Sequence, residues 1–275
     1  MIACALLVSA AVFLSLWMAL SWWVQKETGR SGWIDTFWSY GIGIAGVSLA
    51  LFPVAGTTQR QWLVAALCAF WSLRLGTHIL LRTVGGGDDP RYAQLKKEWK
   101  KDAQQRLFWF LQIQALCGFV LVLAVFVAAH NPLPGLRVLD WIGAALLIVA
   151  IVGEGAADRQ LKEFVADKKN KGKVADTGLW SYSRHPNYFF EWLGWFAYVL
   201  IAFNASGNYW WWPLALLAPA MMYWLLVHAS GIPPLEQHML RSRGAKFRDY
   251  QQRVNAFFPG PRREPGKPSR KRKNK

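Results

Sequence analysis

The stretch GLWSYSRHPNYFFEWLGWFAYVLIAF, residues 178–203, places a polar motif directly before a long apolar run. Together with its flanks the run approaches the length that crosses a bilayer core, about twenty residues. Glu191 stands inside the run, four residues after Asn187 of the motif, so a carboxylate and an amide would share one helical face. Polar groups at membrane depth are costly and typically functional. The stretch therefore predicts a membrane helix with a functional site at its mouth.

Apolar runs of similar length recur along the chain and predict its fold class. The chain has 275 residues, of which 53% are hydrophobic. Seven runs approach the length that spans a bilayer, at about residues 2–24, 33–52, 60–82, 107–129, 138–157, 187–204 and 209–229. We predict an all-α polytopic integral membrane protein with about seven transmembrane helices, in which residues 1–260 form a single domain.

The distribution of basic residues predicts the orientation. Seven spans put the loops at 25–32, 83–106 and 158–186 on the same side of the membrane as the segment from Ser230 onward. These four segments hold all but four of the 32 lysines and arginines. Because basic residues accumulate on the cytoplasmic side, we expect the C-terminus and the polar motif to face the cytoplasm.

The formal net charge of +16 raises the question of nucleic-acid binding. No nucleic-acid-binding motif accompanies the charge, so we expect no nucleic-acid partner. Basic segments beside membrane spans ordinarily contact anionic lipid headgroups, and membrane lipids are the partner that we expect. The strongly basic end, residues 261–275, is expected to be a disordered cytoplasmic tail.

The loop at 83–106 contains a glycine-rich turn and a basic helix. The turn at 85–90 lacks the Gly-Lys-Ser/Thr ending of a phosphate-binding loop, and no strand is expected before it. Residues 91–106 have the pattern of a basic amphipathic helix at the membrane interface, with Tyr92 on the boundary between its wet and apolar faces.

Ionisable residues at membrane depth recur at a four-residue spacing. Arg74, His78 and Arg82 share a face of the third span, and Glu154 and Asp158 share a face of the fifth. Such faces must point at protein or water rather than lipid, which predicts a polar, partly basic cavity open to the cytoplasm. The three cysteines lie in apolar runs without metal-ligand spacing, so we expect no metal site.

The motif at residues 178–188 suggests what the cavity could hold. Arg184 and His185 stand beside the start of a helix, where backbone amides favour an anionic group such as phosphate. The neighbouring aromatic residues offer flat faces and hydroxyl groups for a ring or a ribose. Structural explanations stay open for other members of the set: Arg82 could reach the headgroups, and Asp35 could pair with Arg74.

Several segments resemble those of the steroid 5α-reductase-like membrane enzymes. Residues 177–180 and 184–188 with Glu191 are similar to the C-terminal signature of that family. Further similar segments lie at residues 34–38, 73–75, 230–236, 247–250 and 257–259. The resemblance covers about residues 32–259 and is strongest in the C-terminal half.

The resemblance implies an all-helical seven-span enzyme that binds NADPH in a cytoplasm-facing cavity. Relatives in this family reduce the carbon–carbon double bond of an enone in a steroid or a similar lipid. The cofactor-binding residues that we expect are Arg82, Glu154, Asp158, Trp180, Tyr182, Arg184, His185, Asn187, Tyr188, Glu191, Glu236, His238 and Tyr250.

The chain departs from the family's pattern at the substrate. The steroid enzymes hold the substrate ketone with a Glu in the second span and a Tyr in the third. Here the second-span acid is Asp35, no Tyr stands in the third span, and His78 is the substitute donor. We expect Asp35, kept protonated by apolar surroundings, and His78 to donate hydrogen bonds to the developing enolate oxygen.

Two other functions stay open. The isoprenylcysteine and phospholipid methyltransferases, which use S-adenosylmethionine, carry a similar Arg-His-Pro-x-Tyr run and a later Glu beside a basic, aromatic segment. Glu236 and Tyr250 fit that pattern as well. A non-enzymatic lipid-binding protein, in which the polar cluster only packs loops, is the third reading.

Overall fold

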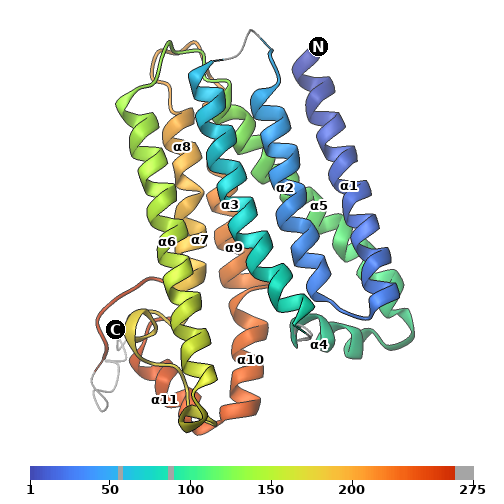
Figure 1. The fold of residues 1–275 in the computed structure, drawn as a ribbon, viewed down its shortest axis with the longest axis vertical. Helices are drawn as coiled ribbons and strands as arrows, with labels where there is room; N and C mark the ends of the chain where they lie inside the picture. The colour runs from blue at the N-terminus through green and yellow to red at the C-terminus, as the bar shows by residue number, and fades with distance from the viewer. Residues whose placement is uncertain (55–57, 86–89, 264–275) are drawn as a thin grey trace, which may run out of the picture. The chain divides into compact units, whose positions relative to one another are not determined.

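The computed structural model describes residues 1–54, 58–85 and 90–263, and these residues form helices joined by loops, with no β-strand among them (Figure 1). The chain separates into two compact units. The first, here called the bundle unit, comprises Met1–Ile151 and Trp192–Leu225. The second, here called the motif unit because it contains most of the polar motif, comprises Val152–Glu191 and Leu226–Lys275.

Six helical segments of the described chain are long and apolar enough to cross a membrane, which confirms the predicted all-α polytopic class. They are Ile2–Thr28, Gly32–Leu51, Gln59–Val84, Arg91–Ala129, Val138–Ala166 and Trp212–Arg243. The elements within and between them are α1 (Ile2–Thr28), α2 (Gly32–Leu51), α3 (Gln59–Val84), α4 (Pro90–Trp99), η1 (Lys100–Asp102), α5 (Ala103–Ala129), α6 (Val138–Ala166), η2 (Lys168–Asn170), η3 (Gly178–Ser181), α7 (Pro186–Gly194), α8 (Phe196–Ala202), η4 (Trp212–Leu216), α9 (Leu217–Trp224), the π-helix η5 (Leu225–Ala229), α10 (Ile232–Arg243) and α11 (Ala245–Arg253).

The expected span at 187–204 is helical but is not one continuous helix, and it is not among the six segments of the described chain that are long enough to cross a membrane. The chain there forms two short helices, α7 and α8, which are interrupted at Trp195. The amide of Trp195 bonds the carbonyl of Trp192, three residues back, at 3.2 Å. This tighter turn breaks the regular i to i−4 ladder of an α-helix. Hydrophobicity predicted an apolar segment correctly but carried no information on this break.

Tightly packed small residues join α2 and α3 of the bundle unit, which lie side by side in Figure 1. A Cβ added at Gly43 would lie 2.0 Å from Ser72 Oγ. A Cβ added at Gly76 would lie 2.7 Å from the Tyr40 ring. Small residues let two membrane helices approach closely, and their contacts replace the hydrophobic effect that is weak between helices in lipid.

Indole groups join α1 to its neighbours in the bundle unit. Trp17 Nε1 donates to the carbonyl of Phe37 in α2 at 2.8 Å, and Trp22 Nε1 donates to the carbonyl of Gln104 in α5 at 3.0 Å. In a low-dielectric environment each such bond satisfies a donor that would otherwise be costly to bury. These bonds place the first turn of α2, where Asp35 lies, against the neighbouring helices.

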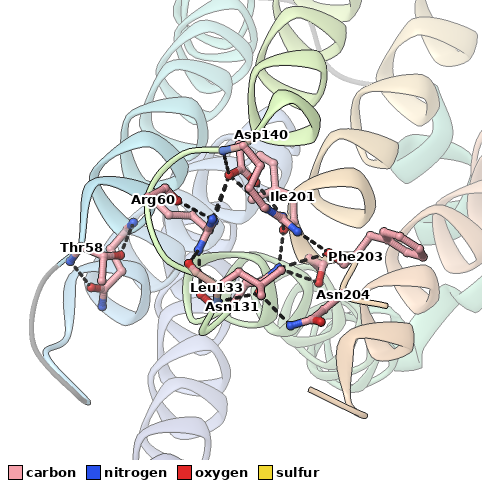
Figure 2. A network of polar contacts seen from close by, with 12 residues as sticks. Thr58, Arg60, Asn131, Leu133, Asp140, Ile201, Phe203 and Asn204 are labelled. Carbon is pink, nitrogen blue, oxygen red and sulfur yellow. Dashed lines mark hydrogen bonds and ion pairs between the residues drawn. The ribbon is translucent and has the colours of Figure 1, made fainter. Parts of the chain in front are cut away.

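A buried arginine organises one end of the bundle unit (Figure 2). Arg60, in the first turn of α3, is 1% exposed, and all five of its N–H groups are used. Two bond Asp140 Oδ2, at 3.2 and 3.0 Å, and the others bond the carbonyls of Asn131, Leu133 and Gly135 at 2.6 to 2.8 Å. One side chain therefore fixes the loop between α5 and α6 and the start of α6.

The described beginning of the expected tail is ordered by contacts. Arg263 donates from its backbone to the Arg253 carbonyl at 2.9 Å and from its side chain to Asn255 Oδ1 at 2.8 Å. Arg262 contacts Asp176. Residues 264–275, which carry most of the predicted disorder, and residues 86–89 of the predicted glycine-rich turn lie outside the described residues.

Replacing Arg60 with alanine should destabilise the protein strongly. The change removes the arginine donors of three carbonyls, of which that of Asn131 is buried, and removes one of the two arginines that pair with Asp140. Breaking a buried ion pair costs about 3–5 kcal/mol. Thermal unfolding in detergent measures the loss, with Arg106→Ala as the control, because that exposed pair with Asp102 should be worth about 1 kcal/mol or less. Equal losses of stability in the two variants would contradict the structural role of Arg60.

Candidate functional site

The predicted site residues divide between the two units. Asp35, His78 and Arg82 belong to the bundle unit. The motif unit contains Glu154, Asp158, Trp180, Tyr182, Arg184, His185, Asn187, Tyr188, Glu191, Glu236, His238 and Tyr250. The residues expected to hold a cofactor, apart from Arg82, thus fall into one compact unit.

In the motif unit, the loop before α7 is docked on α6. The Leu179 amide bonds Gln160 Oε1 at 2.9 Å, and the indole Nε1 of Trp180 bonds the Ala157 carbonyl at 3.0 Å. Gly178 adopts φ 58, in the left-handed region, and an added Cβ would lie 2.6 Å from Gln160 Oε1. Glycine is therefore required at the start of this loop.

Arg184 is engaged by protein groups. Its Nε and Nη2 bond the two carboxylate oxygens of Glu236 in α10 at 2.7 and 3.2 Å. Its Nη1 bonds the carbonyls of Val254 and Gln251 at 2.5 and 3.2 Å. Bidentate arginine–carboxylate pairs are strong and specific in geometry. Arg184 thus holds the beginning of α7 to α10 and α11, and these contacts use four of its five N–H groups.

His185 is buried beside this ion pair. Its Nε2 lies 3.2 Å from Glu236 Oε1, and its ring stacks on Tyr188 with centroids 5.5 Å apart and planes 13° apart. Burial lowers the pKa of His185, and the Arg184 charge acts in the same direction while Glu236 opposes both. The neutral ring, with Nε2–H donating to Glu236, is therefore the favoured form.

Asn187 has a buried acceptor that the described chain does not satisfy. Its Nδ2 donates to Asp158 Oδ1 at 3.2 Å, whereas its Oδ1 is buried without a hydrogen-bond partner among the described residues. The carboxylate of Asp158 can only accept, so it fixes the orientation of the amide and leaves the oxygen free. Buried polar atoms are nearly always paired with protein, water or a ligand, so this oxygen could accept a hydrogen bond from a ligand N–H or O–H.

The other candidates of the motif unit differ in their exposure. Glu154 and Glu191 are buried, at 6% and 8% exposure, while the Tyr182 side chain is 54% exposed. His238 is exposed on α10. Tyr250 is buried, and its hydroxyl donates to the Trp180 carbonyl at 2.6 Å. It therefore contacts the loop before α7, residues 178–185, here called the signature loop.

In the bundle unit, the partners of Asp35 come from α4. Tyr92 Oη donates to Asp35 Oδ1 at 2.7 Å, and the Arg91 guanidinium contacts Oδ2. Gln114 Nε2 in turn donates to Tyr92 Oη at 3.0 Å. Asp35 thus contacts polar groups of α4, where the sequence suggested apolar surroundings. His78 is exposed on α3.

Tyr92 is the residue that sequence reasoning missed. The resemblance requires a tyrosine beside the second-span acid, and the third span contains none. Tyr92 lies in the next helix, and the structure buries it to 3% exposure instead of leaving it at the boundary of an interface helix. Its position directly after Arg91, within a few residues of the end of α3, is the signal that could have identified it.

A comparison with protein families decides the membership of this chain. The family described as "Protein of unknown function (DUF1295)" matches residues 21–254, which include both Asp35 and the polar motif. The chain belongs to the DUF1295 family. An uncharacterized protein of Schizosaccharomyces pombe is 26% identical to it over 278 residues, covering 86% of this chain and 75% of that protein. No solved structure matches the DUF1295 chain.

The lowered pKa of His185 predicts how the stability of this chain depends on pH. Because burial lowers this pKa below its ordinary value of 6.5, the unfolded state takes up the proton first as the pH falls. The stabilising contribution of neutral His185 is therefore complete above about pH 6.5 and is lost as the pH falls further. Thermal unfolding between about pH 5 and pH 8 should show a smaller loss at the acid end for His185→Gln than for the wild type. If the melting temperatures of the two proteins fell equally with pH, a lowered pKa of His185 would be contradicted.

Proposed function

We propose that this protein is a membrane oxidoreductase that uses NADPH to reduce the activated carbon–carbon double bond of a lipid enone. The observation that carries the proposal is the buried, unsatisfied Asn187 Oδ1 beside Asp158 in the polar motif. The proposal is also supported by the family, which is associated with steroid 5α-reductase-like proteins. The cytoplasmic orientation inferred from basic residues belongs to the same proposal, because NADPH would reach the motif from the cytoplasm.

The motif unit contains groups that fit a nicotinamide dinucleotide. Asn187 Oδ1 and Asp158 would accept hydrogen bonds from a carboxamide or from ribose hydroxyls. The exposed ring of Tyr182 would offer a flat face to a base or a nicotinamide. When bound, the cofactor would supply the hydride, and the residues of the protein would orient the reactants and polarise the substrate.

The bundle unit offers a hydrogen-bond donor for the substrate oxygen. Reduction of an enone adds a hydride at the β-carbon and a proton at the α-carbon, and negative charge develops on the carbonyl oxygen between these events. In the proposed mechanism the substrate oxygen replaces Asp35 as the acceptor of the Tyr92 hydrogen. Arg91 keeps its ion pair with Asp35, and Gln114 continues to donate to Tyr92 Oη. Preorganised donors of this kind are often the largest catalytic contribution.

A methyltransferase that uses S-adenosylmethionine is the second candidate. The observation that favours it is a pair of buried carboxylates in the motif unit, Glu154 and Glu191, which stand four residues from Asp158 and Asn187 respectively. A cationic sulfonium would be favoured by such charges. Methyl transfer needs no donor from Tyr92, so Asp35→Asn and Tyr92→Phe should leave a methyltransferase active but should slow a reductase.

Replacing Asn187 with alanine should weaken NADPH binding by about tenfold, because one buried hydrogen bond to the ligand is worth about 1 kcal/mol or slightly more. Isothermal titration of the purified protein with NADPH and with S-adenosylmethionine measures this effect. Asn170→Ala, a loop variant in the same unit, is the control and should bind as the wild type does. A wild-type protein that binds no NADPH at about millimolar concentration would refute the reductase.

Replacing Tyr92 with phenylalanine should lower kcat by about a hundredfold, the usual cost of removing one donor to a developing oxyanion. NADPH binding should be unchanged, because Tyr92 is not among the residues proposed to hold the cofactor. Loss of NADPH absorbance with an enone lipid measures the rate. Tyr40→Phe is the control, since its hydroxyl contacts Thr77 at 3.0 Å between α2 and α3. A Tyr92→Phe enzyme as fast as the control would exclude the assigned role.

A further inference from the structure

The loop that contains the polar motif takes its hydrogen-bond partners from the C-terminal part of the motif unit. The Tyr182 carbonyl accepts from the Gly260 amide at 3.0 Å, and the Arg184 amide donates to the Asn255 carbonyl at 2.9 Å. Ser183 Oγ donates to the Phe257 carbonyl at 2.8 Å. Residues 182–184, which follow η3, thus have these polar groups satisfied by a second segment, which fixes the shape of the loop.

Tyr250 makes the deepest of these contacts. Its ring belongs to a small hydrophobic core with Phe247 and Val254, against which Val174, Met239 and Leu240 pack. From this core its hydroxyl donates to the Trp180 carbonyl at 2.6 Å. Burial raises the pKa of Tyr250, so the hydroxyl stays protonated and remains a donor.

Trp180 connects this contact to the candidate ligand site. Its indole Nε1 donates to the Ala157 carbonyl at 3.0 Å. The next residue of α6 is Asp158, whose carboxylate accepts from Asn187 Nδ2. The backbone of Trp180 is therefore held from one side by Tyr250, while its side chain contacts the turn of α6 that orients the Asn187 amide.

We infer that Tyr250 is a positioning residue for the ligand site of the polar motif, acting through Trp180 on the Asp158–Asn187 pair. This inference rests on the proposed function for the identity of the ligand, NADPH, but its structural step does not. Tyr250 was a candidate for direct cofactor contact, and its 2% exposure and its bond to the loop assign it this indirect role instead.

The chain provides a matched control for the test. Tyr209, in the bundle unit, is also buried, at 7% exposure, and its hydroxyl donates to the Val127 carbonyl at 2.8 Å. Tyr250→Phe and Tyr209→Phe each remove one buried hydroxyl-to-carbonyl bond, so both should lower the melting temperature. Only Tyr250→Phe should raise the Kd for NADPH, by about tenfold, the factor that corresponds to about one buried hydrogen bond.

Hydrogen exchange of the ligand-free protein separates this inference from the proposed function. In Tyr250→Phe, amides of residues 178–185 should exchange faster, because the loop loses one anchor, whereas Tyr209→Phe should leave them unchanged. If the wild type binds no NADPH, the proposed function fails, and the exchange result alone decides the role of Tyr250. Unchanged exchange, or equal changes of Kd in the two variants, would overturn the inference. If Tyr250→Phe does not fold, Trp180→Phe, which removes the bond to Ala157, must give the same weaker binding.

Discussion

A charge that is removed from water must be paired within the protein, and this constraint governs both units of the structure. In the bundle unit Arg60 uses every donor that it has, on Asp140 and on three carbonyls. In the motif unit Arg184 divides its donors between Glu236 and two carbonyls of the C-terminal segment. In each case one guanidinium joins segments that are distant in sequence, so the positions of loops depend on a few charged groups.

Against this background the free oxygen of Asn187 is significant. In the described part of the motif unit it is the buried side-chain atom without a hydrogen-bond partner, whereas other atoms of this kind, such as Gln25 Oε1 and Gln104 Oε1, lie in the bundle unit. Because buried polar atoms are nearly always paired, the proposed function assigns this oxygen a ligand donor. Asp35, in contrast, has both oxygens occupied by residues of α4. A substrate that reaches Asp35 or Tyr92 must therefore compete with contacts that the protein makes with itself.

The sequence allowed the class of fold and most helix positions to be predicted, because membrane spans depend on local hydrophobicity alone. The break at Trp195 was not predictable in this way, because it concerns the hydrogen-bond geometry of one turn within a uniformly apolar segment. The residues of the polar motif lie in one unit, but the sequence did not indicate their partners. Arg184 and Glu236 are 52 residues apart, and no periodicity indicates that they pair. Tyr92 was missed for the same reason, since its contact with Asp35 joins positions 57 residues apart.

The dependence of the signature loop on the C-terminal segment also has a consequence for biosynthesis. Trp180 leaves the ribosome 70 residues before Tyr250, the residue that bonds its carbonyl. The bonds from Asn255, Phe257 and Gly260 become available later still. Because domains fold as their residues emerge, the apolar helices can insert while the motif still lacks its anchors. The loop at residues 178–185 is then completed among the last steps of synthesis, so a chain interrupted before α11 would insert its apolar helices but would lack the contacts that fix this loop.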